Sequence, residues 1–162
     1  EHAQHVHEED ILRFGDLGVT ASIQPIHLTL DLETIKTKLP DRVNRAYPIR
    51  QLISAGATVV FGSDTPIASP DLSPAFKAAV LRCGSTGETL TPEEGVTSTQ
   101  TARAYTVDAA RAIGRGDRSG IVRIGYHADF TIFEGNPIKS DSEIDIYGTI
   151  KSGRWTSCRR TG

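Results

Sequence analysis

The chain has no methionine, only two cysteines and few aromatic residues, which make up 6% of its 162 residues. No apolar run approaches the roughly 20 residues that a helix needs to cross a bilayer, and no stretch has the pattern of a signal peptide. The formal net charge is −2, and no basic face with interleaved aromatic residues is present. These absences argue against a membrane or a nucleic acid as partner, and we expect a cytoplasmic protein.

The two cysteines, Cys83 and Cys158, lack the spacing of a metal site and are typical of a reducing compartment. The length suffices for one domain of ordinary size but falls short of the roughly 250 residues of a complete (β/α)₈ barrel. Because the chain has no methionine with which translation could start, we expect it to be the carboxyl-terminal piece of a longer protein.

Helix and strand patterns alternate in the first half of the chain, and a glycine follows each helix. Apolar residues recur at helical spacing in some segments, whereas others are short, apolar and β-branched. This order predicts βαβ units that form a parallel sheet. Helices are predicted over residues 8–17, 48–56 and 75–82, and strands over residues 19–24 and 57–60.

Three further segments complete this part of the chain. The pattern of residues 28–40 is mixed, and no element is assigned there except a turn at Pro40. Thr91 and Glu94 have the spacing of a capping box, with proline between them, which predicts a helix start and a helix that carries Val96 and Ala102. A short helix over residues 107–113 follows.

The chain changes character near Gly116, where short strand-like runs replace the helices. Such runs are predicted over residues 120–125 and 128–133, and a hairpin joins residues 147–151 to residues 154–157 through a Ser-Gly turn. We therefore predict two parts, residues 1–116 with a barrel-like α/β pattern and residues 117–162 with small β-strands.

Asp64 stands where the apolar strand of residues 57–60 runs out. The carboxyl ends of parallel strands are where α/β enzymes keep their chemistry, and a carboxylate can bind a cation or act as a general base. An Asp in this position can equally cap the turn or helix that follows. Taken alone, the residue supports the two interpretations about evenly.

Two histidines are candidate partners of Asp64. An imidazole near a strand end is a common zinc ligand, but His2 lies at the terminus, where a disordered side chain is the simpler interpretation. His27 follows the strand that ends at Gln24, so it should face the same edge of the sheet as Asp64. A substrate contact and an ordinary loop position are comparably supported for His27.

The other candidates have simpler explanations. His5 and His7 lead into the first helix, where polar residues are common, and His127 lies in a turn between small strands. Ser63 has no base partner in the sequence, so a serine nucleophile is poorly supported.

Taken together, several motifs resemble the last part of metal-dependent amidohydrolases, in particular the branch of TIM-barrel metal-dependent hydrolases. The resemblance covers nearly the whole chain and rests on the order and spacing of the motifs. They are Glu1-His2-Ala3-Gln4, Ser22-Ile23-Gln24-Pro25, Phe61-Gly62-Ser63-Asp64-Thr65-Pro66, Ala128-Asp129-Phe130 and Ile150-Lys151-Ser152-Gly153.

This resemblance implies a fold and a set of roles. The fold is α/β: the carboxyl-terminal part of a TIM barrel, about strands 6–8, followed by part of a small β-sandwich domain. His2 matches a metal ligand from the sixth strand, and Asp64 matches the metal ligand of the eighth that also shuttles the proton. Gln24 and His27 would meet the substrate. The implied reaction is attack of metal-activated water on an amide-type carbon–nitrogen bond of a small molecule, with one or two divalent cations, expected to be Zn²⁺.

Such enzymes also take a His-x-His pair and further ligands from strands that this chain lacks. We therefore expect the chain alone to bind metal weakly and to be inactive without the amino-terminal half of the same protein. Three strands cannot close a barrel, so we also expect self-association that covers the exposed strand edge. The alternative function is a non-catalytic binding or structural module; a flavodoxin-like domain is disfavoured because no glycine-rich phosphate loop is present.

Overall fold

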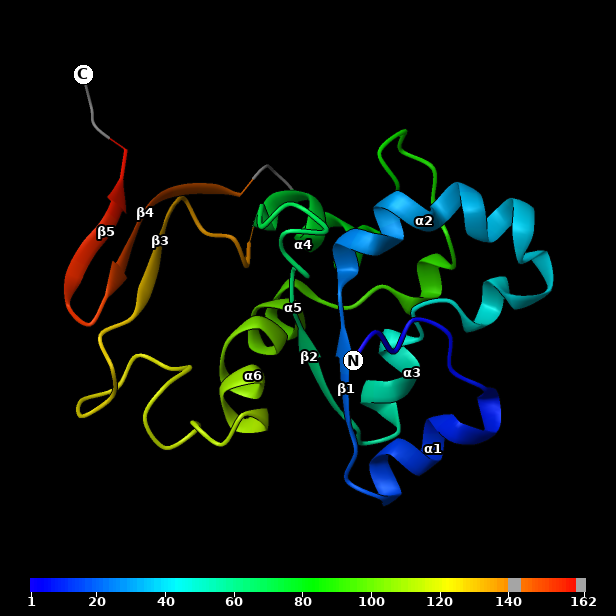
Figure 1. Ribbon diagram of the computed structural model, residues 1–162, viewed down its shortest axis with the longest axis horizontal. Helices are drawn as coiled ribbons and strands as arrows, with labels where there is room; N and C mark the ends of the chain where they lie inside the picture. The colour runs from blue at the N-terminus through cyan, green and yellow to red at the C-terminus, as the bar shows by residue number, and fades with distance from the viewer. Residues whose placement is uncertain (140–143, 160–162) are drawn as a thin grey trace.

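A parallel pair of strands lies at the centre of the molecule (Figure 1). The computed structural model describes residues 1–139 and 144–159. Strand β1 (Thr20–Ile23) pairs in parallel with β2 (Thr58–Phe61), in a register that runs from Thr20 opposite Thr58 to Ile23 opposite Phe61. The predicted α/β pattern with parallel pairing is thus confirmed. Residues 1–4, which the family resemblance treats as a strand, form no regular strand, but the Ala3 N–H donates to Ser22 O at 3.0 Å beside β1.

Six α-helices surround these strands in the described residues, and the three predicted at residues 8–17, 48–56 and 107–113 are confirmed with small shifts of their ends. Helices α3, α5 and α6 pack against β2, whereas α1 packs on α3, and α2 packs on α4. The helices are α1 (Glu8–Asp16), α2 (Pro25–Lys38), α3 (Ile49–Ser54), α4 (Leu72–Leu81), α5 (Ser98–Tyr105) and α6 (Val107–Ala112), with 3₁₀ turns at Pro40–Arg45 and Pro92–Glu94.

Helix α2 is the largest element that the sequence pattern did not predict. Pro25 does end β1, as expected, but it also occupies the first turn of this 14-residue helix. Leu28, Leu32 and Ile35 are buried at helical spacing. Exposed leucine and threonine residues between these positions blur the period, which is why the segment looked mixed.

Two predicted helix starts were wrong. Helix α4 begins at Leu72 rather than Ala75, because Asp71 Oδ1 accepts a hydrogen bond from the Ser73 N–H at 3.0 Å and caps it. Residues 92–94 form only a 3₁₀ turn, and α5 begins at Ser98, where Thr97 and Gln100 form the capping box.

The core lies between the strands and the helices. Ile23, Ile49 and Leu52 are fully buried there, together with residues of α2 and α4. Burying an aliphatic side chain of this size contributes about 1.5–3 kcal/mol. The guanidinium of Arg82 is also fully buried, where it donates to the carbonyl oxygens of Leu90 and Ala46.

The carboxyl-terminal part forms a separate antiparallel sheet, to the left in Figure 1. It contains β3 (Phe130–Glu134), β4 (Asp145–Lys151) and β5 (Arg154–Cys158), in the order β3-β4-β5. The predicted hairpin is confirmed: Ser152 and Gly153 have φ angles of 50° and 76°, which a tight primed turn requires. The strand predicted over residues 120–125 is wrong, since that segment has no strand partner and exposes Val122 and Ile124.

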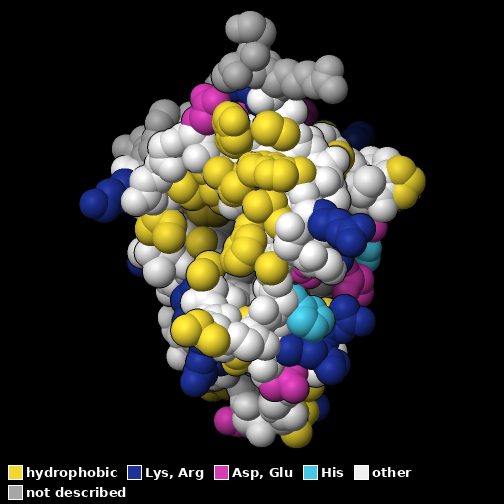
Figure 2. Space-filling model, turned by 90° about the vertical axis from the view of Figure 1, so that its left-hand side faces the viewer, with side chains coloured by type: hydrophobic (Ala, Val, Ile, Leu, Met, Phe, Trp, Pro, Cys, Tyr) yellow, Lys and Arg dark blue, Asp and Glu magenta, His cyan; other side chains and the backbone are white. Residues whose placement is uncertain are grey.

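Apolar side chains gather on the side of the molecule that carries this sheet (Figure 2). A hollow of about 740 Å³ lies between helices α4–α6 and the sheet, lined by residues that include Phe76, Tyr105 and Phe130. In the described residues, no helix is long and apolar enough to span a membrane.

Candidate functional site

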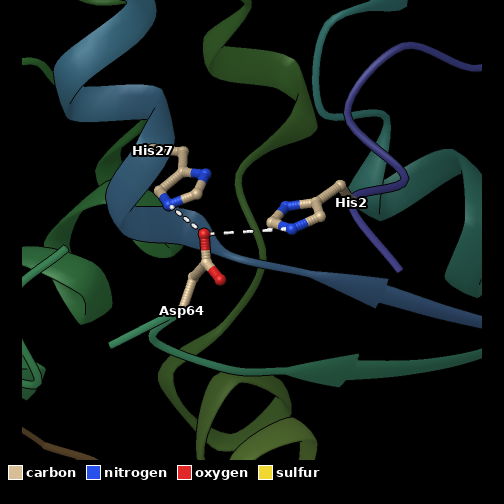
Figure 3. A group of neighbouring side chains, drawn as sticks. All are labelled: His2, His27 and Asp64. Carbon is tan, nitrogen blue, oxygen red and sulfur yellow. Dashed lines mark ion pairs between the residues drawn. The ribbon is translucent and has the colours of Figure 1, made fainter. Parts of the chain in front are cut away.

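Asp64 lies just beyond the carboxyl end of β2. Its backbone has a φ of 58°, a left-handed conformation that Asp adopts more readily than most residues. Its carbonyl oxygen accepts the Ile67 N–H at 2.8 Å. The backbone of Asp64 therefore closes the turn after β2. The side chain of Asp64 projects toward His2 and His27 (Figure 3).

His2 approaches from the amino-terminal segment. The Ala3 N–H bond to Ser22 fixes this segment against β1, and the Tyr47 N–H donates to Gln4 O at 2.6 Å on the other side. His2 Nε2 lies 3.8 Å from Asp64 Oδ2. The His2 imidazole therefore has defined neighbours, although the residue lies near the amino terminus.

His27 comes from the first turn of α2, which begins directly after β1. Its Nε2 lies 3.5 Å from Asp64 Oδ2, and its Nδ1 lies 3.0 Å from the Gln4 side-chain nitrogen. Only 12% of its side chain is exposed, and its buried Nε2 makes no hydrogen bond to the described residues. A buried ring nitrogen in this state is costly unless another group pairs with it.

The three side chains form one cluster with the chemistry of a cation site. The rings of His2 and His27 stack with centroids 5.6 Å apart and an interplanar angle of 11°. One ligand atom from each of His2, His27 and Asp64 lies within 4.8 Å of the others. Imidazole nitrogens with a carboxylate oxygen are a donor set that suits Zn²⁺, so these residues fit a divalent cation. His2 and Asp64 remain 43% and 31% exposed, which leaves the cluster open to small molecules.

The side chain of Gln24, the residue that precedes α2, makes its hydrogen bond to Glu1. It is buried at the end of β1, and its Nε2 donates to Glu1 Oε1 at 2.5 Å. Its Oε1 is buried and has no hydrogen-bond partner among the described residues. This carbonyl oxygen is therefore a buried acceptor that the described residues leave unpaired.

The remaining candidates stay outside the cluster. His7 caps α1 by accepting the Glu9 N–H, and Ser63 Oγ bonds to Thr65 Oγ1 at 3.0 Å. Burial lowers the pKa of the His5 imidazole, and the positive charge of Arg42 lowers it further. His127 lies in the irregular segment before β3.

Gln4 is the neighbour of the site that the sequence interpretation missed. The Gln4 side chain reaches the site from a segment that is not extended, because His2 has a φ of 55° and the Gln4 N–H donates to His2 O at 2.7 Å. Sequence spacing alone therefore could not have identified Gln4.

Comparison with known proteins gives a consistent result. The amidohydrolase family model matches residues 1–156. The chain is 33% identical over 160 residues to the protein LONG AFTER FAR-RED 3 of Arabidopsis thaliana, covering 95% of this chain and 27% of that protein. It is 31% identical over 161 residues to the putative amidohydrolase YtcJ of Bacillus subtilis, covering 94% of this chain and 30% of that protein.

A solved structure extends the likeness to three dimensions. An uncharacterized metal-dependent hydrolase from Pyrococcus horikoshii superposes with a TM-score of 0.74 at 25% identity, covering 86% of this chain and 29% of that chain. The chain thus spans less than a third of the length of each of these three proteins.

Proposed function

Because the chain belongs to the amidohydrolase family, we propose that it contributes His2 and Asp64 to the metal centre of a hydrolase acting on non-peptide, amide-type carbon–nitrogen bonds. The observation that carries this proposal is the approach of His2 Nε2 to Asp64 Oδ2, at 3.8 Å, from segments 62 positions apart in the sequence. A histidine and an aspartate from separate segments provide the nitrogen and oxygen donors that a divalent cation such as Zn²⁺ accepts.

The proposed chemistry assigns Asp64 two duties. A bound divalent cation would supply Lewis acidity, which lowers the pKa of water toward ~7 and polarises the bond to be cleaved. Asp64 takes the proton that the attacking water loses and returns it, from the same carboxylate, to the departing nitrogen. His2 holds the cation against this carboxylate, and the exposure of both side chains gives the substrate access.

Gln24 is the residue that we assign to the substrate. Its buried Oε1 lacks a hydrogen-bond partner among the described residues, and its Nε2 is held by Glu1. A fixed acceptor of this kind suits a substrate N–H or O–H. His27, which the family resemblance also implies for the substrate, is held by its neighbours: its Nδ1 lies 3.0 Å from the Gln4 side-chain nitrogen, and its Nε2 lies 3.5 Å from Asp64 Oδ2.

The position of the chain within the fold is part of the same proposal. We assign β1 and β2 to the seventh and eighth strands of a (β/α)₈ barrel, and residues 1–4 to the end of the sixth. Residues 117–162 would form part of a small β-sandwich domain. The change from parallel to antiparallel pairing and the absence of assigned elements between Ala112 and Phe130 support a boundary near residue 116.

The test uses the complete natural polypeptide, its zinc content and a panel of N-formyl and N-acyl amides. Asp64→Asn should lower hydrolysis by about 10²-fold or more, because it removes both a ligand and a proton carrier. Asp117→Asn, an exposed aspartate outside the cluster, is the matched control and should hydrolyse normally. Normal turnover by Asp64→Asn, or wild-type protein without metal, would refute the proposal and favour a non-catalytic module.

A further inference from the structure

Arg82 is a charged residue in a fully buried position. It directly follows α4 and exposes no surface to solvent, and its Nη1 makes no hydrogen bond to the described residues. Burial lowers the pKa of the guanidinium to about 10, so the group is still charged at neutral pH. Burying a charge costs free energy, and a well-packed apolar side chain would fill the same space at lower cost. Filling space therefore does not explain an arginine at this position.

The guanidinium of Arg82 connects two segments that are distant in the sequence. Its Nε donates to Leu90 O at 3.2 Å, and its Nη2 donates to Ala46 O at 2.9 Å and to Thr91 Oγ1 at 2.8 Å. Its Cζ also lies 5.9 Å from the centroid of the Tyr47 ring. Because the donors of a guanidinium form a rigid planar fork, Arg82 fixes the position of Ala46 and Tyr47 relative to the segment after α4.

The peptide group between Ala46 and Tyr47 contacts the amino-terminal segment on its other side. Its C=O accepts from Arg82, and its N–H donates to Gln4 O at 2.6 Å. The C=O and N–H of a trans peptide point in opposite directions within one plane, so this peptide lies between Arg82 and Gln4. The Gln4 N–H in turn donates to His2 O at 2.7 Å. A chain of hydrogen bonds therefore runs from Arg82 to the backbone of His2.

Tyr47 has a conformation that needs support from its surroundings. Its φ is 52°, in the left-handed region that residues with large side chains rarely adopt. Its hydroxyl donates to Asp31 Oδ2 at 3.0 Å, on the same helix as His27. We propose that Arg82 is a positioning residue of the metal site, which fixes His2 through the peptide between Ala46 and Tyr47. This inference rests on the proposed function, in which His2 binds the cation.

The competing interpretation gives Arg82 a purely structural role. Its contacts with Leu90 and Thr91 would then serve only to hold the segment after α4. In that case a substitution of Arg82 would lower the stability of the protein and leave the cation environment of the folded protein unchanged. The two interpretations therefore differ in what they predict for the folded variants.

The first experiment measures the zinc affinity of the complete natural polypeptide by competition with a chromogenic chelator, under conditions where circular dichroism shows each variant to be folded. Arg82→Met keeps the apolar part of the side chain and removes its donors. It should weaken zinc binding by about 10-fold, on the order of the effect of a group that orients a metal ligand. In a His2→Ala background the same substitution should change the affinity by less than about 2-fold, because Arg82 acts through His2. Equal losses in both backgrounds would overturn the inference.

Two further variants separate positioning from stability. Ile11→Ala is the control: Ile11 is buried in α1, outside these contacts, so this variant should lower the urea midpoint and keep the wild-type zinc affinity. Arg82→Lys keeps the charge but has a single flexible ammonium group, which cannot hold the same acceptors in a fixed geometry. It should weaken zinc binding by at least ~3-fold, and it provides the test if Arg82→Met does not fold. Wild-type affinity in Arg82→Lys would contradict the inference.

The second experiment replaces zinc by Co²⁺, whose visible absorption depends on the arrangement of its ligands. The spectrum should change in Arg82→Lys and stay as in the wild type in Ile11→Ala. An unchanged spectrum in Arg82→Lys would show that Arg82 serves stability only, which would overturn this inference and leave the proposed function standing. Equal zinc affinity in the wild type and in His2→Ala would instead refute the proposed function, and this inference with it.

Discussion

Glu94 caps the start of helix α3 and also binds the side chain of Gln51, although Glu94 and Gln51 are far apart in the sequence. Glu94 Oε1 accepts a hydrogen bond from Gln51 Nε2 at 2.7 Å, and Oε2 accepts the backbone N–H groups of Arg50 and Gln51 at 3.0 and 3.2 Å. Glu94 is buried. The first N–H groups of a helix have no partner inside it, so this carboxylate satisfies two of them and complements the positive end of the helix dipole.

Replacing Glu94 by alanine should therefore destabilise the protein by about 2–4 kcal/mol, because two buried N–H groups lose their acceptor. Urea denaturation followed by circular dichroism would measure the change. Glu93→Ala is the matched control: its side chain is exposed, so its effect should stay within about 0.5 kcal/mol. Equal losses in both variants would contradict the capping role of Glu94.

The same carboxylate explains one failure of prediction from sequence. Thr91 and Glu94 have the spacing of a capping box, yet Thr91 has a φ of 44° and makes no capping hydrogen bond. Its hydroxyl instead accepts a hydrogen bond from the buried Arg82 guanidinium at 2.8 Å. Local spacing cannot predict this, because both partners are brought in by tertiary packing.

Elsewhere, local signals were enough. The β-branched run ending at Phe61, the apolar stripe of α1 and the Ser-Gly turn of the hairpin each specify one conformation without help from distant residues. Helix α2 was missed because its buried leucines are interrupted by exposed apolar residues such as Leu30.

The candidate site likewise has one part that could be predicted from the sequence and one part that could not. That Asp64 and His27 should face one edge of the sheet could be predicted, because each follows the carboxyl end of a parallel strand. The hydrogen bond between Gln4 and His27 and the one between Gln24 and Glu1 could not. Both depend on how the amino-terminal segment crosses the end of β1, and that segment has no regular secondary structure to guide a prediction.

Tyr105 offers a test of an unsatisfied buried group. Its ring packs edge-on against Phe61 with centroids 5.4 Å apart, but its hydroxyl is buried with no hydrogen-bond partner among the described residues. Tyr105→Phe keeps the ring and removes the unpaired hydroxyl, so stability should stay equal or rise by up to ~2 kcal/mol. Urea midpoints would measure this.

Tyr126→Phe is the matched control with the opposite expectation. The Tyr126 hydroxyl donates to Gly116 O at 3.2 Å, and losing that bond should cost about 0.5–1.5 kcal/mol. A loss in Tyr105→Phe as large as the loss in Tyr126→Phe would mean that the Tyr105 hydroxyl has a partner after all.

The advantage of Tyr105→Phe should grow at alkaline pH. Burial raises the pKa of the Tyr105 phenol. Below about pH 10 the phenol is protonated in both the folded and the unfolded chain. Above that pH the unfolded chain releases the proton while the folded protein keeps it, so wild-type stability falls by up to ~1.4 kcal/mol per pH unit from this group. Urea midpoints of both proteins at about pH 8 and about pH 11 should therefore diverge; a constant difference would contradict the sign.

Asp129 should make the hairpin of β4 and β5 sensitive to acid. Its carboxylate accepts hydrogen bonds from Lys151 Nζ at 2.5 Å and from the Ser152 N–H at 2.8 Å, and these bonds hold the pKa of Asp129 below its usual range. The stabilising contribution is thus fully present above the ordinary pKa of about 3.9, and it is lost as pH falls through the lower folded value.

In an acid titration followed by NMR, the Ser152 amide resonance should shift with the protonation of Asp129. Asp129→Asn keeps an oxygen acceptor but cannot titrate, so this pH-dependent shift should disappear while the hairpin persists. Asp117→Asn, which changes an exposed carboxylate in the segment before β3, should leave the titration of Ser152 as in the wild type. A Ser152 amide that titrates unchanged in Asp129→Asn would show that another acid controls the turn.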